Sequence, residues 1–360
     1  MEEDKPNNTG TAQINAADVA RKPIIAVTMG DPGGIGAEVV VKALADPQIR
    51  ESGRFIIYGL NELMSYAADS AEIAPYWWRR PHEAVRKIES GAVVADFDEF
   101  GLPGPRNAQP TAQGGLASMR FLEEAVASIK AGRAHALVTA PISKTSWHMA
   151  GYKRWPGHTE WLAEQFHTRR VTMMFDAGRL RVALASTHLG LFELRNRFTI
   201  GLVHQPIDLL DRALREWFGI ELPRLAVCAL NPHAGEGGRF GDEETRIIEP
   251  AITMAREHGC HVEGPLPADT VFGDALAGRY DGVVAMYHDQ GLIPIKLLAF
   301  HRAVNVSLGL PIVRTSPDHG TAFDIVGTNT ANPGSMKAAI LLACRLARFR
   351  MAAASAVSAP

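Results

Sequence analysis

The 360-residue chain has few cysteines, no excess of charge of either sign and no long apolar run. Its three cysteines, Cys228, Cys260 and Cys344, are scattered and odd in number, which argues against a disulfide framework and for a reducing compartment. Lysine and arginine total 37 and aspartate and glutamate 39, so the net charge of −2 favours neither nucleic acid nor an anionic membrane surface as a partner. No apolar stretch approaches the roughly 18 residues of a membrane span. We therefore expect a cytoplasmic protein with no membrane and no nucleic-acid partner.

The rest of the composition is that of an average globular protein, with 46% hydrophobic and 21% charged residues. At roughly 150 residues per domain, this length predicts about two domains. The polar start of the chain, residues 1–21, is expected to form a disordered arm. The Ala- and Ser-rich residues 351–360 are expected to form a frayed tail.

Strand-like apolar runs alternate with helical patterns along most of the chain, which predicts α/β architecture with a largely parallel sheet. Strands are expected at residues 24–28, 54–58, 136–139, 171–175, 181–186, 225–230, 283–286 and 304–307. Helices are expected near residues 37–45, 118–131, 202–218, 244–258 and 335–349.

Three of the apolar runs lead into a histidine: His188, His233 and His288. Ligands of open α/β sheets bind beyond the carboxyl ends of the strands, so each imidazole would lie at a ligand-binding edge. One such histidine is more often a packing or capping residue, but three in the same setting favour a shared polar site. Their sequence separation excludes a local motif such as HExxH, so they would have to converge in three dimensions. Three imidazoles suit Zn, Co, Ni or Fe(II) and leave coordination positions open for a substrate.

A glycine-rich loop, GDPGGIG at residues 30–36, follows the first predicted strand and opens a helix. The loop lacks the GxGxxG spacing of a dinucleotide-binding turn, and no acidic residue ends the second strand in the expected way. Two interpretations remain. The helix N-terminus binds an anion, or the loop is a purely structural turn.

His158 and Thr159 precede an apolar-periodic helix. Thr159 is either a plain N-cap or part of a phosphate or carboxylate site that also includes His158 and the helix N-terminus.

Lys296, Asn305 and Arg314 follow the last histidine and lie among apolar residues. A cation in such surroundings is costly unless it meets an anion. These side chains are candidates for binding a substrate anion, with ordinary ion pairs as the alternative. The polar loop at residues 318–324 suits a turn or a nucleotide.

Long motifs of a known family occur over residues 22–348. They are GDPGGIGAE (30–38), TAPISK (139–144), PGHTE (156–160), STHLGL (186–191), NPHAGEGGRFGDEE (231–244), GPLPADT (264–270), YHDQGLIPIK (287–296) and LGLPIVRTSPDHGTA (308–322). On these motifs the chain resembles the 4-hydroxythreonine-4-phosphate dehydrogenases of pyridoxal phosphate biosynthesis and their paralogues, which act on 4-phospho-D-threonate or 4-phospho-D-erythronate. Residues 239–246 and 294–298 lean toward the paralogues, which leaves the exact substrate open.

The resemblance implies a two-domain α/β/α fold similar to that of isocitrate and isopropylmalate dehydrogenases, with the active site in the interdomain cleft. It also implies a homodimer with a shared active site. The first α/β domain, on the cofactor side, would comprise residues 22–148 and 315–350. The second, on the metal and dimer side, would comprise residues 149–314.

The resemblance also implies the roles of individual residues. A divalent metal would be bound by His188, His233 and His288, one of them from the other subunit. The substrate would be bound by His158, Thr159, Lys296, Asn305 and Arg314. The cofactor would be bound by His319, Gly320, Thr321, Ala322, Asp324 and Asn332.

The implied reaction is an NAD- or NADP-dependent oxidation of the C3 hydroxyl of a phosphorylated four-carbon hydroxy acid, with coupled decarboxylation. The substrate would be 4-phosphohydroxy-L-threonine or, alternatively, 4-phospho-D-threonate or 4-phospho-D-erythronate, which would give dihydroxyacetone phosphate. The metal would be Zn, Co or Mg. Lys144, Asp269 and a metal-bound hydroxide are the candidate bases, although Asp269 could instead orient a ligand histidine. A metal-dependent hydrolase and a non-catalytic ligand sensor are remote alternatives.

Overall fold

One twelve-stranded sheet organises the structure, a computed structural model that describes residues 22–85, 88–101 and 108–357. The strands are β1 (Ile24–Thr28), β2 (Arg54–Gly59), β3 (Trp77–Pro81), β4 (Ala92–Asp96), β5 (Ala136–Thr139), β6 (Thr172–Asp176), β7 (Arg181–Leu184), β8 (Arg224–Cys228), β9 (His261–Leu266), β10 (Gly282–Ala285), β11 (Val304–Leu308) and β12 (Val313–Pro317). Their order is β3-β4-β2-β1-β5-β12-β11-β6-β7-β10-β8-β9.

Most neighbouring strands are parallel, as the sequence predicted. The first parallel group contains β3, β4, β2, β1, β5 and β12, and the second contains β7, β10, β8 and β9. Between the groups, β11 and β6 make the antiparallel pairings β12–β11, β11–β6 and β6–β7. Strands such as β5 and β10 are buried along their whole length, which is why they consist of continuous apolar runs. The predicted α/β class is confirmed.

Helices cover this sheet. They are α2 (Gly36–Leu44), α3 (Pro47–Glu51), α4 (Asn61–Ser70), α5 (Ala112–Lys130), α6 (Lys144–Met149), α7 (His158–Gln165), α8 (Leu191–Arg197), α9 (Ile200–Glu216), α10 (Glu249–Glu257), α11 (Ala268–Leu276), α12 (His288–Ala299) and α13 (Gly334–Val357). Side-chain caps fix several starts: the hydroxyls of Thr111, Ser143 and Thr199 accept N–H hydrogen bonds at the first turns of α5, α6 and α9. No helix in the described parts of the chain is long and apolar enough to cross a membrane.

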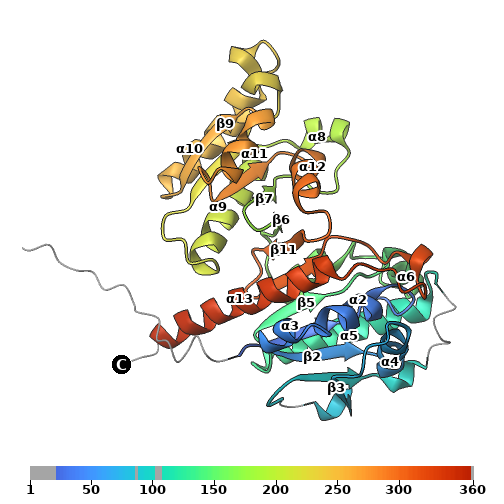
Figure 1. Cartoon of the computed structure of the whole chain (residues 1–360). Helices are drawn as coiled ribbons and strands as arrows, with labels where there is room; N and C mark the ends of the chain where they lie inside the picture. Colours follow the sequence, from blue (N-terminus) through green and yellow to red (C-terminus); the bar gives the residue numbers. More distant parts are fainter. Residues whose placement is uncertain (1–21, 86–87, 102–107, 358–360) are drawn as a thin grey trace, which may run out of the picture.

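Figure 1 shows two lobes, one around each parallel group of strands. Helices α2 to α5 lie in the first lobe, and α9 to α12 lie in the second (Figure 1). The last helix, α13, packs against β5, β12 and α2, so the chain returns at its end to the first lobe. β11 and β6 therefore lie where the two lobes meet.

The end of the chain differs from the expectation. α13 continues to Val357, so residues 351–357, expected to form a frayed tail, are helical. Ala352 is buried, as are Leu342, Leu346 and Ala347 earlier in the same helix. This packing explains why the helix continues beyond the predicted end. The predicted arm at 1–21 and residues 358–360 lie outside the described residues.

Candidate active site

A cavity of about 370 Å³ lies between residues of the first lobe, β6, β11 and the loops after β7 and β10. Nine of the residues singled out from the sequence line it: Lys144, His158, Thr159, His188, His288, Asn305, Arg314, His319 and Gly320. Segments far apart in the sequence therefore converge on one concave polar site, which is the usual setting of an active site.

Arg314 is the most buried charge in this cavity, with 3% of its surface exposed. It lies on β12, where its Nη2 and Nε atoms donate to the Thr139 hydroxyl at 2.6 and 3.2 Å and its Nη1 atom donates to the Ser307 hydroxyl at 3.0 Å. None of the described carboxylates is within ion-pair distance of the guanidinium. Burial lowers the pKa of Arg314 to about 10, and the more distant Glu160 opposes this shift. The strand holds a cation that is hydrogen-bonded but not neutralised.

His158 begins α7 and is next to this cation. Burial lowers its pKa well below the ordinary value, and the charge of Arg314 lowers it further, so the ring is neutral. Its Nε2 atom is buried and has no hydrogen-bond partner. Thr159 is buried but does not cap the helix, because Gly157 is the N-cap and no side chain caps this end. The plain N-cap interpretation of Thr159 is therefore wrong, and its hydroxyl remains available to the cavity.

Asn305 and Lys296 differ in how they are held. Asn305, on β11, has a buried Oδ1 atom without a partner, and its Nδ2 atom lies 3.8 Å from the sulfur of Met173. Lys296, on α12, forms an ion pair with Asp318 at 2.7 Å and does not line the cavity. Within one chain, Lys296 therefore forms an ordinary ion pair, which is the alternative that the sequence left open. Asn305 instead lines the cavity, and its Oδ1 atom accepts no hydrogen bond from the described residues.

The three predicted metal ligands follow three adjacent strands, β7, β10 and β8, as the sequence indicated. His188 and His288 line the cavity, and their ring centroids are 6.5 Å apart. His233 does not line it, and the described residues of one chain contain no group of three side chains that could hold a metal. The structure brings together two of the three, and the three-histidine site stays a prediction.

The reason for the separate position of His233 is the backbone after β8. Residues 233 to 237 all have positive φ, with His233 at 53°, Ala234 at 54° and Glu236 at 41°. Consecutive left-handed residues turn the chain away from the path of a right-handed helix. The Glu244 carboxylate anchors the start of this loop, because its Oε1 accepts the N–H groups of Leu230 and Asn231 at 2.8 and 2.7 Å. His233 is consequently exposed on a rigidly anchored loop.

The two side chains considered as catalytic bases lie in different places. Lys144 lines the cavity at the start of α6, whereas Asp269 is exposed in the first turn of α11 and does not. Glu160, which the sequence reasoning missed, lines the cavity as well. Burial lowers the pKa of His188, Lys144 lowers it further and Glu160 opposes the shift, so these three side chains share one electrostatic environment. The signal for Glu160 was its position beside His158 and Thr159 in the same motif.

Known proteins are similar to this chain in sequence and in fold. The family model described as "Pyridoxal phosphate biosynthetic protein PdxA" matches residues 51–343. The chain belongs to this family. A 4-hydroxythreonine-4-phosphate dehydrogenase of Geobacter metallireducens is 45% identical over 337 residues, covering 91% of this chain and 97% of that protein. A D-threonate 4-phosphate dehydrogenase of Salmonella typhimurium is 42% identical over 326 residues, covering 90% of this chain and 98% of that protein.

Among solved structures, the crystal structure of a 4-hydroxythreonine-4-phosphate dehydrogenase from Klebsiella pneumoniae has a TM-score of 0.80 at 40% identity. The match covers 91% of this chain and 100% of that chain. The predicted resemblance is confirmed, and this PdxA-family chain matches its relatives over nearly their full length.

The glycine-rich loop of this PdxA-family chain is held by internal hydrogen bonds. The Gly33 N–H donates to the Asp31 carboxylate at 2.9 Å, and the Ile35 N–H donates to the Thr321 carbonyl at 3.0 Å. Gly30 has φ of +78°, and a Cβ there would lie 2.2 Å from the Pro141 carbonyl oxygen, so only glycine fits. Because N–H groups of the loop already donate within the protein, the geometry favours the structural turn over an anion site.

The residues predicted to bind the cofactor lie in two places. His319 and Gly320 line the active-site cavity, and burial lowers the pKa of His319. Thr321 packs on the glycine-rich loop, while Ala322 has a left-handed backbone. Asp324 and Asn332 are exposed. The segment thus runs from the cavity to the surface of α2.

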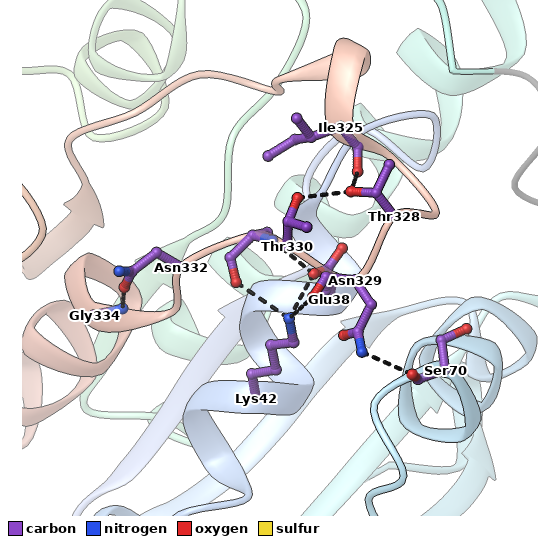
Figure 2. A network of polar contacts seen from close by, with 10 residues as sticks. Glu38, Lys42, Ser70, Ile325, Thr328, Asn329, Thr330, Asn332 and Gly334 are labelled. Atoms are coloured by element: carbon purple, nitrogen blue, oxygen red, sulfur yellow. Dashed lines mark hydrogen bonds and ion pairs between the residues drawn. The ribbon is translucent and has the colours of Figure 1, made fainter.

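A polar network holds the later part of that segment on α2 (Figure 2). The Lys42 ammonium donates to the Glu38 carboxylate at 2.7 Å and to the carbonyl oxygens of Asn329 and Ala331 at 2.9 and 3.3 Å. Glu38 also accepts the Ala331 N–H at 2.9 Å. Asn332 accepts the N–H of Gly334 at 2.8 Å, which positions the start of α13. We call Glu38, Lys42 and these partners the α2 network.

Proposed function

We propose that this protein is a dehydrogenase that oxidises the C3 hydroxyl of a phosphorylated four-carbon hydroxy acid with coupled decarboxylation, using NAD or NADP and a divalent metal. The relatives are named as dehydrogenases of 4-hydroxythreonine 4-phosphate and D-threonate 4-phosphate. The observation that carries the proposal is Arg314, a buried cation that faces the cavity with only hydroxyl partners. A buried charge without a counter-charge is costly, so this site favours an anionic ligand.

Four side chains would bind the substrate. Arg314 would donate to its phosphate or carboxylate oxygens, and the hydroxyl of Thr159 would add a further contact. The unpartnered Nε2 of His158 and Oδ1 of Asn305 would hydrogen-bond to substrate atoms, because buried polar atoms are rarely left unpaired. These contacts fix the position of C3 through groups remote from the reaction.

His188 and His288 fit a metal from one chain, because two imidazoles face the same cavity from neighbouring strands. A bound divalent metal would supply Lewis-acid chemistry at the substrate hydroxyl and the later keto acid, and the oxidised nicotinamide would accept the hydride. Zn, Co and Mg are the candidate ions. Of the two protein bases considered, Lys144 is favoured over Asp269, because its side chain lines the cavity and would move the C3 hydroxyl proton at its Nζ atom.

His233 would complete the metal site of a second copy in a homodimer. Helices α8 and α12 begin next to His188 and at His288, and both expose large apolar side chains. Phe192 is 94% and Leu297 85% exposed, with Leu191, Ile293 and Phe300 also more than half exposed. Exposed apolar patches of this kind mark protein interfaces. A partner covering them would also bring its own His233 loop close to the site.

The test of the reaction is a comparison of 4-phosphohydroxy-L-threonine, 4-phospho-D-threonate and 4-phospho-D-erythronate with NAD or NADP and each metal. We expect the nicotinamide to be reduced, with one of the three acids strongly preferred. The absorbance of the reduced nicotinamide measures the rate. The same mixture without protein serves as the control for the non-enzymatic rate. Absence of nucleotide reduction with all three acids in folded, metal-loaded protein would refute the proposal.

The shared site is tested by mixing two inactive chains after dissociation. A dimer of one His233→Ala and one His288→Ala chain contains one intact site if His233 acts across the interface. Random pairing makes half the dimers mixed, so we expect about a quarter of the wild-type activity to return. His188→Ala mixed with His288→Ala should recover nothing. Recovery in the second mixture and not the first would refute this assignment.

A further inference from the structure

A second cavity, of about 540 Å³, lies on the other side of the junction between the lobes. It is bounded by the turn between β6 and β7, the ends of α11 and α12, the start of β11 and the middle of α13. Its size is within the roughly 300–1,000 Å³ range of small-molecule sites. None of the residues assigned to the candidate active site lines it, so it is a separate feature of the molecule.

Three arginines line this cavity without an anionic partner in the described structure: Arg179, Arg302 and Arg345. Arg179 donates to the Leu276 carbonyl oxygen at 2.7 Å, and the guanidinium of Arg345 lies 5.3 Å from the centre of the Phe218 ring. The one carboxylate in the lining, Asp176, is already paired with Arg181 at 3.2 Å. The cavity therefore has an excess of positive charge.

Apolar side chains provide the rest of its surface. Val304 and Leu342 are buried, whereas Leu298 and Leu341 are 41% and 44% exposed. Water-exposed leucines beside unpaired guanidinium groups favour a ligand with two chemically different ends. We propose that this cavity binds an amphiphilic anion, in which a carboxylate, sulfonate or phosphate group contacts the arginines and an apolar body covers the leucines.

The second cavity and the active-site cavity share two strands. Successive side chains of a strand point to opposite faces of the sheet. On β6, Phe175 lines the active-site cavity and Asp176 the second cavity, and on β11 the same holds for Asn305 and Val304. A ligand in the second cavity therefore lies against the backs of the two strands that carry active-site residues. Binding there is expected to change the KM for the acid substrate.

The probe for the experiment is 8-anilinonaphthalene-1-sulfonate, which combines an aromatic body with a sulfonate. Its fluorescence in a titration of the full chain should show one saturable site per chain. The double variant Arg302→Gln/Arg345→Gln should bind it at least about tenfold more weakly, because it loses two charge-assisted contacts to the sulfonate. Arg80→Gln, an exposed arginine on the edge strand β3, is the matched control and should not change binding.

One further variant and one uncharged probe keep the test independent of charge loss and folding. Ala338→Trp should block binding by filling the cavity, because this partly exposed residue of α13 lines it. The uncharged N-phenyl-1-naphthylamine should bind weakly, and equally to the wild-type chain and to Arg302→Gln/Arg345→Gln. Unchanged sulfonate binding in both the double variant and Ala338→Trp, or displacement of the probe by NAD, would overturn the proposal.

The anionic head could belong to a soluble molecule or to a membrane lipid. Decanoate should displace the probe from the wild-type chain in solution. The wild-type chain should not sediment together with phosphatidylglycerol vesicles. If it does, and if Arg302→Gln/Arg345→Gln does not, the anionic head group belongs to a membrane lipid. Failure of decanoate and of the vesicles to displace the probe would contradict the proposed ligand class.

Discussion

Lys42 in the α2 network and Arg314 in the active-site cavity are both cations shielded from solvent, yet their surroundings differ. Lys42 meets a carboxylate and two carbonyl oxygens, so its three N–H groups all have acceptors (Figure 2). Among the residues that the structure describes, Arg314 meets only two hydroxyls. Glu38 accepts two hydrogen bonds, whereas the cavity leaves His158 Nε2 and Asn305 Oδ1 without a partner. The hydrogen bonds of the first site are complete within the protein, whereas the second site keeps a cation without a counter-charge and two polar atoms without partners among the described residues.

The largest expected effect is the loss of a histidine that we propose as a metal ligand. His288→Ala should lower kcat/KM about a thousandfold or more, because a metal contributes several kcal/mol and 1.4 kcal/mol corresponds to a factor of ten. The melting temperature in metal-free buffer should not change, since the side chain is half exposed. His261→Ala, an exposed histidine at the start of β9, is the control. Equal activity of both variants would contradict the metal assignment.

Replacing the unpaired cation should separate function from stability. Arg314→Met should lower kcat/KM by at least about tenfold, because charge-assisted hydrogen bonds contribute roughly 1.5–3 kcal/mol each. The same change should raise the melting temperature of the ligand-free protein, since it removes a buried charge without a counter-charge. Arg314→Lys should recover only part of the activity, because an ammonium cannot reproduce the planar fork. A variant with wild-type kinetics would mean that Arg314 has a structural role.

The complete network should respond in the opposite way. Glu38→Ala removes one of the three acceptors of Lys42 and the acceptor of the Ala331 N–H, and should lower the free energy of unfolding by about 1–3 kcal/mol. The KM for the acid substrate should not change, because Glu38 does not line the active-site cavity. Glu38→Gln keeps an acceptor and should be milder. Urea unfolding and steady-state kinetics measure the two effects, and a change confined to kinetics would contradict the comparison.

The smallest effect concerns pH. Since the pKa of His158 is lowered in the folded state, the unfolded chain binds more protons between that pKa and the ordinary value near 6.5. Stability should therefore be lost as the pH falls through 6.5, by at most about 1.4 kcal/mol per pH unit from this group. His158→Gln should remove this part of the slope in urea unfolding measured below pH 6.5. An identical acid slope in both proteins would show that His158 is protonated when folded.

Strands were predictable from the sequence where apolar runs end at clear breakers. β1 and β5 match the expected 24–28 and 136–139, whereas β3, β4, β9 and β12 were missed. In β12 the polar sequence around Arg314 is buried, because its side chain points into a site rather than into solvent. In β3, at the edge of the sheet, exposed tryptophan and arginine residues give no alternation of polar and apolar residues.

Candidate site residues could be singled out where their chemistry conflicted with their surroundings. Arg314, a charge among apolar residues, became a candidate for binding an anion in this way; the described residues give it no counter-charge, and its role stays a proposal. Thr139 and Ser307, whose hydroxyls hold that guanidinium, carry no such signal, because hydroxyls in strands are common. The position of His233 could not be predicted, since the end of a strand fixes where a loop begins and not where it leads.

That loop has a consequence for protein engineering. A left-handed conformation costs an L-residue roughly 1–2 kcal/mol, and Ala234 and Glu236 both adopt it. Glycine at these positions would remove the strain but would also enlarge the set of shapes open to the unfolded chain. A semisynthetic chain with D-alanine at position 234 avoids this compromise, because the mirror-image residue prefers positive φ and remains restricted. It would restrict the loop that presents His233, at the cost of moving one methyl group, and the side chains of the other loop residues would be unchanged.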